Sequence, residues 1–316
     1  MLLMNWMVNM RNHVIDRITQ LAKTDERIIL MTADLGFSVL ENFAEKFKDR
    51  YINVGIAEQN MTSVAVGLAL EGNMVFTYSI GNFPTLRCLE QIRNLVCYHD
   101  ANVKILAVGG GFAYGSLGMT HHATEDIAVM RALPNMKVYV PADEVEAIAC
   151  LEEIYKTNSP CYLRMARGKE PSVHNPDVHL DVSKFVPVVT DGHDVVLLAT
   201  GTIVAEAVRA QKFLKDSGIV ASVYSVPCIK PMDNTSLDEF INKSKLIVTI
   251  EEHNIVGGLG SAVSELLSTK GTHAPLVRIG LNDEYTVEVG EQDYLRDYYG
   301  LSAHKVYDKI LKAIRG

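Results

Sequence analysis

A glutamate at the start of a predicted helix is the first candidate for chemistry in this sequence. Glu58 lies in the run 54–60, between a short predicted strand and a helix predicted to end near Leu70. Helical spacing places Met61 and Ala65 on the same side of that helix as Glu58. The Glu58 carboxylate is therefore expected to point inward.

Two roles fit an inward carboxylate at this position. A first-turn glutamate interacts favourably with the helix dipole. Alternatively, Glu58 is a buried proton-transfer group, because an apolar environment disfavours the ionised form of a carboxyl and such tuning suits proton exchange near neutral pH. Spacing alone leaves both interpretations open.

Two adjacent histidines form a second candidate. His121 and His122 precede Glu125 and Asp126 at an expected loop-to-helix junction. Neighbouring histidines point in different directions and no third ligand is evident, so a metal site is not expected. A substrate-contacting pair and a simple capping role both remain open.

Other runs that look like sites have plainer interpretations. Gly-rich runs at 109–111 and 257–260 match neither a dinucleotide fingerprint nor a phosphate-binding loop, so tight turns or close helix packing are favoured. Phe83 follows a strand end and is either core or a flat surface for a heteroaromatic ring. The run 251–254, Glu-Glu-His-Asn, also follows a strand, and an interface or structural role is favoured there.

An alternation of strands and helices has to position these residues. A helix over 6–22 starts the series, and helices are expected around Phe43, Met61, Gln91, Ile127 and Ile148. Such alternation predicts α/β architecture with mostly parallel sheets, in which ligands bind beyond the carboxyl ends of the strands. The expected strands are 28–31, 51–54, 75–78, 103–108, 137–140 and 161–164, then 195–199, 221–225, 246–251 and 276–279.

The length of 316 residues suggests two domains. The alternation breaks at a proline-containing stretch, which predicts a first doubly wound domain over 1–175, a linker over 176–191, and a smaller α/β domain over 192–316. With 30 basic against 38 acidic residues and no long single-sign block, neither nucleic acid nor a membrane surface is expected as a partner. Five scattered cysteines predict reduced thiols, and no signal or membrane segment is recognised, which favours the cytoplasm.

Three runs together resemble the transketolase family of thiamine diphosphate-dependent enzymes. They are Val-Gly-Ile-Ala-Glu-Gln-Asn at 54–60, Glu-Gln-Ile-Arg-Asn at 90–94, and Gly-Met-Thr-His-His at 118–122 leading into Leu-Pro-Asn-Met at 133–136. The likeness covers nearly the whole chain and corresponds to the C-terminal half of transketolase, meaning its pyrimidine-binding domain plus its C-terminal domain. The family's Gly-Asp-Gly motif, which holds Mg²⁺ and the cofactor diphosphate, does not occur in this sequence.

The resemblance assigns cofactor contacts to this chain. It implies that Glu58 hydrogen-bonds the pyrimidine ring nitrogen of thiamine diphosphate, and that Phe83 stacks on that ring. Ile56 belongs to the same pocket. Ile80 and Leu86 stand where transketolases often carry aromatic residues, so the pocket is expected to be more aliphatic here.

The resemblance also assigns substrate contacts. His121 matches a histidine that contacts substrate hydroxyls near the reacting carbon. Arg11, Ser38 and Arg167 resemble the family's sugar-phosphate clamp, in which a guanidinium binds phosphate oxygens bidentately. The roles of these residues are implications of the resemblance and do not follow from spacing.

Two departures bear on the substrate. Gly109 replaces a histidine of the family, and Leu117 replaces an aspartate that contacts a donor-sugar hydroxyl. Because leucine accepts no hydrogen bond, an unmodified ketose phosphate is not the expected donor. A deoxy or otherwise modified sugar, or a smaller 2-oxo donor, fits better.

The resemblance therefore implies the C-terminal subunit of a heteromeric, transketolase-like transferase, which moves a two-carbon ketol unit between sugars through a carbanion on thiamine diphosphate. The N-terminal partner subunit would hold the diphosphate and Mg²⁺, in an α₂β₂ assembly. Two alternatives remain. One is the β-type subunit of a 2-oxoacid dehydrogenase or a pyruvate-using synthase, and the other is a partner subunit that has lost the chemistry.

Overall fold

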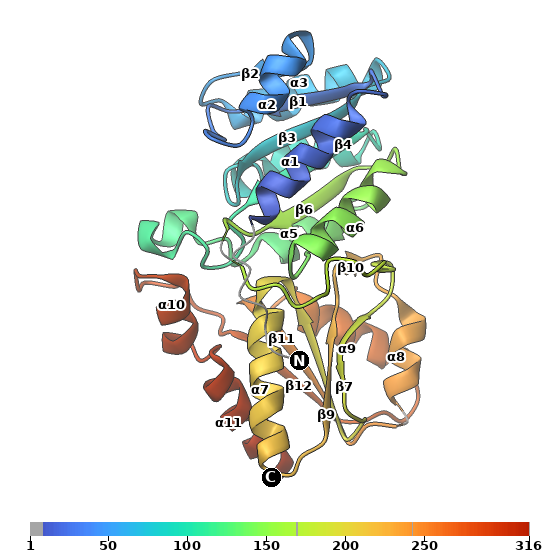
Figure 1. Ribbon diagram of the computed structural model, residues 1–316, viewed down its shortest axis with the longest axis vertical. Coiled ribbons are helices and arrows are strands. Elements are labelled where there is room, and N and C mark those ends of the chain that lie inside the picture. Colours follow the sequence, from blue (N-terminus) through green and yellow to red (C-terminus); the bar gives the residue numbers. More distant parts are fainter. Residues whose placement is uncertain (1–8, 169, 242, 316) are drawn as a thin grey trace.

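The computed structural model describes residues 9–168, 170–241 and 243–315. These residues form two α/β domains stacked along the long axis of the molecule, with the first domain above the second in Figure 1. The predicted fold class, two α/β domains with mostly parallel sheets, is confirmed.

The first domain is built on a seven-stranded sheet in the order β10-β5-β6-β4-β3-β1-β2. All of its pairings are parallel except that of β10 with β5. Strand β4 is buried along its whole length, which fits a parallel sheet covered on both faces. The strands are β1 (Ile28–Thr32), β2 (Tyr51–Asn53), β3 (Met74–Ile80), β4 (Val103–Val108), β5 (Lys137–Tyr139), β6 (Cys161–Met165) and β10 (Cys228–Lys230).

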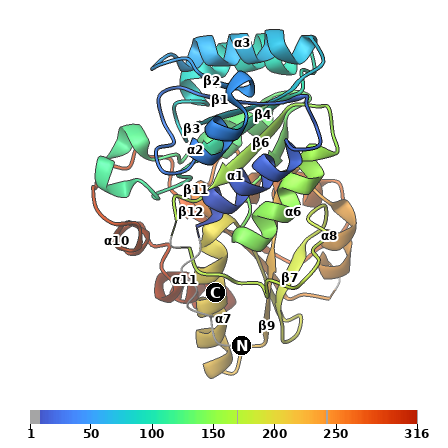
Figure 2. The same cartoon turned by 45° about the horizontal axis from the view of Figure 1, so that its top comes forward.

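Helices cover both faces of this sheet because successive strand residues point to opposite sides. Along β1, Ile28 and Leu30 pack under α1, whereas Ile29 and Met31 pack under α3. Helices α1 and α6 lie side by side across the front in Figure 2. The helices are α1 (Met10–Leu21), α2 (Glu41–Lys46), α3 (Glu58–Leu70), α4 (Leu89–Gln91), α5 (Asp126–Ala132) and α6 (Glu144–Tyr155), with a π-helix at Ile92–Cys97 and short 3₁₀ turns at Lys48–Arg50, Leu86–Cys88, Gly115–Leu117 and Met119–His121.

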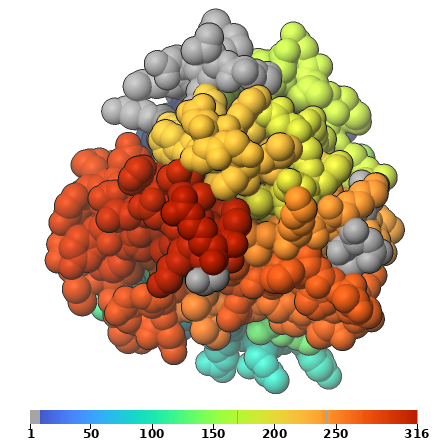
Figure 3. Space-filling view, turned by 90° about the horizontal axis from the view of Figure 1, so that it is seen from below, coloured from blue at the N-terminus to red at the C-terminus, as the bar shows by residue number. Residues whose placement is uncertain are grey.

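The second domain has a five-stranded sheet in the order β12-β11-β8-β9-β7, with only the edge pairing β7 to β9 antiparallel. Helices α7 and α11 pack together on one face, and α9 packs on β11. Figure 3 views this end of the molecule, which residues of the second domain cover in yellow to red. Its elements are β7 (Val186–Thr190), β8 (Val195–Thr200), a 3₁₀ turn (Gly201–Ile203), α7 (Val204–Asp216), β9 (Ala221–Ser225), α8 (Asn234–Ile241), β11 (Leu246–Asn254), α9 (Leu259–Ser268), β12 (Leu276–Leu281), α10 (Gln292–Tyr298) and α11 (Ala303–Arg315).

The two domains interlock through β10. This strand comes from the second half of the chain, yet it pairs antiparallel with β5 at the edge of the first sheet. Lys230 reinforces the contact, because its Nζ donates to the backbone carbonyls of Arg131 and Leu133. One apolar cluster therefore includes Val138 of the first domain and Ile229 of the second.

All ten predicted strands are present, and two further strands were not expected. Strand β7 lies inside the segment 176–191 that was expected to be a linker, and it pairs with β9. Of the helix predicted over 6–22, the part from Met10 to Leu21 is helical, while residues 6–8 lie outside the described residues. All five cysteines are buried and free, and no helix among the described residues is long and apolar enough to cross a membrane.

Candidate active site

The candidate site lies at the carboxyl edge of the first sheet, where the loops after β1 to β4 and β6 converge. Glu58 follows β2, Phe83 follows β3, His121 follows β4, and Arg167 follows β6. In parallel sheets this edge is the usual place for ligands. The fold thus brings residues far apart in the sequence to one end of the domain.

Glu58 is buried at the start of α3, with 3% of its surface exposed. Met61 and Ala65 on the same helix face are also buried, as the helical spacing predicted. The surroundings are not purely apolar, however, because Arg87 Nη1 lies 2.8 Å from Glu58 Oε2 and donates a hydrogen bond to it. The sequence analysis did not identify Arg87, which reaches Glu58 from the loop after β3.

Arg87 joins Glu58 to the aromatic ring of Phe83. The Arg87 guanidinium carbon lies 4.7 Å from the centre of the Phe83 ring, and His121 meets the same ring edge-on at 5.2 Å between ring centres. Two of the predicted cofactor and catalytic residues, Phe83 and His121, are therefore neighbours. Glu58 is linked to them through Arg87.

The other predicted cofactor residues differ in exposure. Ile56 is 80% exposed and Leu86 is 42% exposed, so both present apolar surface to solvent beside Glu58 and Arg87. Ile80 ends β3, where it is partly buried against the core on the α1 side. Ile56 and Leu86 thus give an exposed, partly apolar surface next to Glu58 and Arg87, and this surface together with Glu58 and Phe83 is called the half-pocket below.

The two histidines point in opposite directions and have different roles. Burial, together with the neighbouring His122, lowers the pKa of His121, which favours a neutral imidazole near neutral pH. His122 is buried, with Nδ1 at 2.8 Å from Thr286 Oγ1 and Nε2 at 3.1 Å from the Gly115 carbonyl oxygen. Because Thr286 belongs to the second domain, His122 contacts the domain junction, whereas His121 lies against Phe83 and Tyr114.

Gly109 is explained by close packing. Its φ of +89° favours glycine, and a Cβ there would lie 2.1 Å from the Tyr114 ring. The Arg167 guanidinium carbon in turn lies 4.8 Å from the centre of that ring. The Tyr114 ring therefore takes the space that a larger residue at position 109 would need, and it forms a surface under Arg167.

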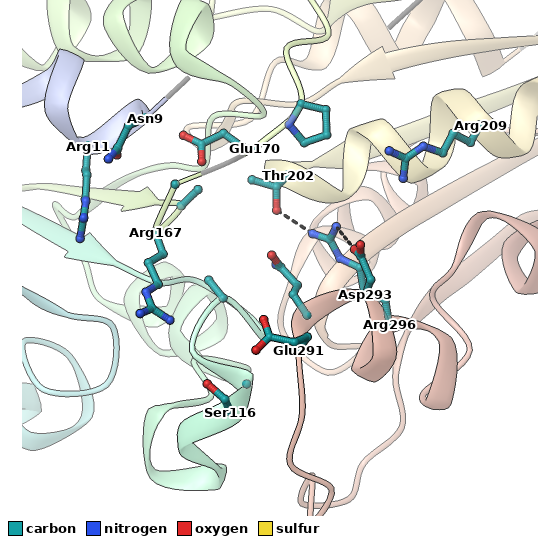
Figure 4. Close-up of a pocket in the computed structure, with 16 residues that line it drawn as sticks. Asn9, Arg11, Ser116, Arg167, Glu170, Thr202, Arg209, Glu291, Asp293 and Arg296 are labelled. Atoms are coloured by element: carbon teal, nitrogen blue, oxygen red, sulfur yellow. Dashed lines mark hydrogen bonds and ion pairs between the residues drawn. The ribbon is translucent and has the colours of Figure 1, made fainter. Parts of the chain in front are cut away.

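A cavity of about 790 Å³ opens between the domains beside Arg167. Figure 4 shows Arg11, Arg167 and Glu170 on its first-domain side, and Glu291, Asp293 and Arg296 on its second-domain side. Three buried polar atoms of its lining have no hydrogen-bond partner within the described residues: Asn9 Oδ1, Arg11 Nε and Glu170 Oε2. Such atoms are expected where a polar ligand completes the hydrogen bonding.

The cavity unites part of the predicted phosphate clamp. Arg11 and Arg167 line it, and neither forms an ion pair with another described residue. Ser38 is exposed in the loop after β1 and does not line this cavity; its backbone N–H donates to Glu41 Oε1 at 2.6 Å. Leu117 is 52% exposed and lies outside the cavity, although its neighbour Ser116 lines it.

The run 251–254 lies at the domain junction. Phe112 N–H donates to Glu252 Oε1 at 2.6 Å, and Arg296 Nε donates to Glu252 Oε2 at 2.5 Å. His253 Nε2 accepts from Ala128 N–H across the same junction at 3.3 Å. These contacts agree with the favoured interface role.

Glu251 explains the glycine-rich run at 257–260. The N–H groups of Leu259 and Gly260 at the start of α9 donate to its carboxylate, and a Cβ at Gly258 would lie 1.9 Å from Glu251 Oε2. Burial raises the pKa of Glu251 to about 7 although both N–H groups oppose that shift, and burial lowers the pKa of His253 to about 4. The acceptor at this helix terminus is therefore supplied by the protein, as the close-packing interpretation predicted.

Two family models cover most of the chain. The model described as transketolase, pyrimidine binding domain, matches residues 7–171, and that described as transketolase, C-terminal domain, matches residues 185–306. These matches fall on the first and second domains of the fold.

Several proteins resemble this chain over nearly their whole length. A putative transketolase C-terminal section from Methanocaldococcus jannaschii is 38% identical over 97% of this chain and 96% of its own. One of the subunits of an apulose-4-phosphate transketolase from Actinobacillus succinogenes is 33% identical over 96% and 97%, respectively. A 6-deoxy-6-sulfo-D-fructose transketolase subunit from a Clostridium species is 35% identical over 94% and 92%.

A solved structure shows the same arrangement of domains. A split-gene transketolase, described as an inactive β4 tetramer, superposes with a TM-score of 0.87 at 36% identity, covering 98% of this chain and 99% of the other.

Proposed function

This chain belongs to the transketolase family, and from that premise we propose that it is the C-terminal subunit of a split transketolase that requires an N-terminal partner subunit for activity. The observation that carries the proposal is the convergence of Glu58, Phe83 and His121 at one sheet edge. The full-length match to a transketolase C-terminal section supports it. The Gly-Asp-Gly motif, which does not occur in these 316 residues, is the part that the partner would supply.

The half-pocket fits the pyrimidine ring of thiamine diphosphate. A buried carboxylate, a partly exposed Phe83 ring and the exposed apolar side chain of Ile56 suit a flat ring with a nitrogen that shares a proton. The bound cofactor supplies the electron sink for the two-carbon unit. Glu58 would hold the ring nitrogen by a hydrogen bond, and Phe83 and Ile56 would exclude water from the ring faces. The partner subunit holds the diphosphate and Mg²⁺.

Substrate recognition falls to His121 and the interdomain cavity. His121, held as a neutral imidazole, can donate and accept hydrogen bonds to sugar hydroxyls beside the Phe83 ring. Arg11 and Arg167 are positioned to bind a phosphate or another anionic group at the far end of the substrate. Ser38 and Gly109 belong to the proposed substrate site through the family resemblance.

We assign a modified sugar as the donor. Leu117 presents apolar surface where the family carries a hydroxyl-binding aspartate. Relatives at 33% and 35% identity are named for apulose 4-phosphate and 6-deoxy-6-sulfo-D-fructose, respectively. Both observations favour a branched, deoxy or otherwise altered sugar over an ordinary ketose phosphate.

The partner subunit is expected on the face that carries the half-pocket. Exposed apolar side chains occur in the segments that follow β1, β2, β3 and β4: Phe37, Ile56, Leu86, Leu117 and Met119. Clustered exposed apolar residues are typical of protein interfaces. An α₂β₂ assembly places the cofactor between the two kinds of subunit.

Calorimetric titration tests the proposal. Thiamine diphosphate with Mg²⁺ is titrated into this chain alone and into this chain mixed with a candidate N-terminal subunit. We expect binding only in the mixture, followed by turnover of a modified ketose and not of pyruvate. A stable mixed complex that takes up no cofactor would show a degenerate subunit, and turnover of pyruvate would indicate the 2-oxoacid class.

A further inference from the structure

We propose that the guanidinium of Arg87 occupies the position of the cofactor's pyrimidine ring in the free subunit, and that cofactor binding displaces it. The inference rests on the proposed function, because it identifies the Glu58 and Phe83 pocket as the pyrimidine site. It adds a positioning residue that acts on the cofactor through Glu58.

The geometry carries the inference. Two groups are assigned to the ring, the Glu58 carboxylate at its edge and the Phe83 side chain at its face. Arg87 makes both of these contacts at once, with Nη1 at 2.8 Å from Glu58 Oε2 and its guanidinium carbon at 4.7 Å from the Phe83 ring centre. A second flat group cannot make the same two contacts while Arg87 remains.

A guanidinium is chemically suited to stand in for the ring. It is planar, it stacks on aromatic faces, and its N–H groups donate to carboxylates. A pyrimidine ring whose nitrogen shares a proton with Glu58 offers the same combination of a flat face and an N–H donor. The free subunit thus satisfies Glu58 and Phe83 with its own side chain.

Arg87 is also able to leave. Its side chain is 47% exposed, and Glu58 is the hydrogen-bond acceptor of its guanidinium within the described residues. The backbone is held separately, because Gln59 Nε2 donates to the Arg87 carbonyl oxygen at 3.0 Å. Rotation of the side chain into solvent therefore leaves the loop after β3 in place.

The arrangement protects the free subunit. A buried carboxylate without a partner is costly, so a lone subunit is more stable when Arg87 compensates the Glu58 charge. The same ion pair must be broken before the ring enters, and it therefore opposes cofactor binding. Assembly with the partner, which brings the diphosphate site, supplies the interactions that overcome this competition.

The test is the affinity of the assembled complex for thiamine diphosphate with Mg²⁺, measured by calorimetry for the wild type and for Arg87→Ala. A half-exposed ion pair is worth about 1 kcal/mol, so removing the competitor is expected to tighten binding about fivefold. Arg87→Lys, which keeps the charge but loses the planar fork, should tighten binding less. Arg27→Ala, which removes an exposed ion pair with Asp25 elsewhere in the same domain, serves as the matched control and should leave affinity unchanged.

A double-mutant cycle tests whether the effect of Arg87→Ala on cofactor affinity depends on Glu58. In a Glu58→Gln background the tightening caused by Arg87→Ala should disappear, because no carboxylate remains to be released. Wild-type uptake with equal or weaker binding by Arg87→Ala would overturn the inference, weaker binding indicating that Arg87 stays and contacts the ring. If no complex takes up the cofactor, including the wild type, the proposed function fails and this inference with it.

Discussion

Two buried glutamates in this molecule, Glu58 and Glu252, are each paired with an arginine but differ in how completely they are bound. Glu58 is 3% exposed, and its carboxylate has Arg87 as its one side-chain partner within the described residues. Glu252 is 2% exposed and accepts hydrogen bonds from Phe112 N–H, Gln292 and Arg296. Arg296 is itself only 4% exposed, whereas Arg87 is nearly half exposed.

The difference separates the proposed binding site from a structural junction. At Glu252 the contacts are supplied by the protein, and the carboxylate joins the two domains through Phe112 and Arg296. At Glu58 the bond to Arg87 can be exchanged, and apolar surface beside it remains open to solvent. The completeness of the surrounding contacts, more than burial or motif, distinguishes the two acids.

Glu58→Gln tests the glutamate whose carboxylate is incompletely bound, and it should have the largest effect on activity. The variant keeps the size of the side chain and removes the carboxylate that shares a proton, so ketol transfer by the assembled enzyme should fall about 10²- to 10⁴-fold. Steady-state turnover with the partner subunit measures this. Turnover close to that of the wild type would remove Glu58 from the mechanism.

Glu252→Gln tests the glutamate whose carboxylate is bound by several protein groups at the domain junction. It leaves the buried Arg296 charge with only the exposed Asp293 carboxylate, at 4.0 Å, which should lower the free energy of unfolding by about 3 to 5 kcal/mol. Urea denaturation of this chain measures the change. Glu58→Gln should cost much less stability in the same assay, and equal losses would show that the two sites do not differ as described.

His253→Gln tests the buried domain junction through the pH dependence of its stability. Burial lowers the pKa of His253 to about 4. Below about pH 6.5, His253 in the unfolded chain therefore binds a proton that His253 in the folded chain does not bind. Wild-type stability should therefore fall, relative to His253→Gln, as the pH decreases from 6.5 towards 4, by up to about 3 kcal/mol. Unfolding midpoints measured across this range give the difference, and a wild-type stability that rises relative to the variant towards low pH would contradict the assignment.

Glu251 requires that this measurement be made as a difference. Its pKa is raised to about 7, so the folded chain binds a proton that the unfolded chain has already released above about pH 4.5. This contribution lowers stability as the pH rises from 4.5 to 7, opposite to that of His253. Because His253 Nδ1 lies 3.6 Å from Glu251 Oε2, replacing His253 also changes the titration of Glu251, so the difference reports the two groups as a coupled pair.

Arg167→Ala extends the comparison to the arginines. Arg167 lines the cavity without an ion pair among the described residues, unlike Arg296. Losing a charged hydrogen bond to phosphate costs about 1.5 to 3 kcal/mol, so KM for a phosphorylated substrate should rise roughly tenfold to a hundredfold. KM for the same sugar without phosphate is the control and should change little. An equal rise for both would argue against a phosphate clamp.

Leu117→Asp should have the smallest effect. Restoring an acceptor at an exposed position is expected to improve kcat/KM for an unmodified ketose phosphate severalfold, by about 1 kcal/mol. Activity on the modified donor should decrease in parallel. Rapid turnover of unmodified ketose phosphates by the wild type would show that Leu117 does not restrict the donor.

The sequence predicted the main strands because buried parallel strands are continuous apolar runs bounded by turns. It could not predict β10, because three residues such as Cys228–Lys230 become a strand only when β5 lies beside them. The half-exposed β7, which contains Pro187, shows no clear alternation of apolar and polar residues, so it was not predicted.

The candidate site, like the fold, was predictable only in part. The helical face of Glu58 followed from spacing, whereas the roles proposed for Phe83 and His121 rest on the family resemblance. Arg87 gave no signal, because it stands 29 residues from Glu58 and in a loop. The packing of Tyr114 against Gly109 could not be predicted either, because the sequence does not show how a loop folds back on itself.

The crossing of β10 into the first sheet bears on how this protein can be divided. A truncation after the first domain would remove β10 and leave the backbone groups of β5 unpaired at an open sheet edge, which promotes aggregation. Separate expression of the two domains should therefore fail although each has its own sheet. The boundary between the two domains is therefore a poor place to divide this chain.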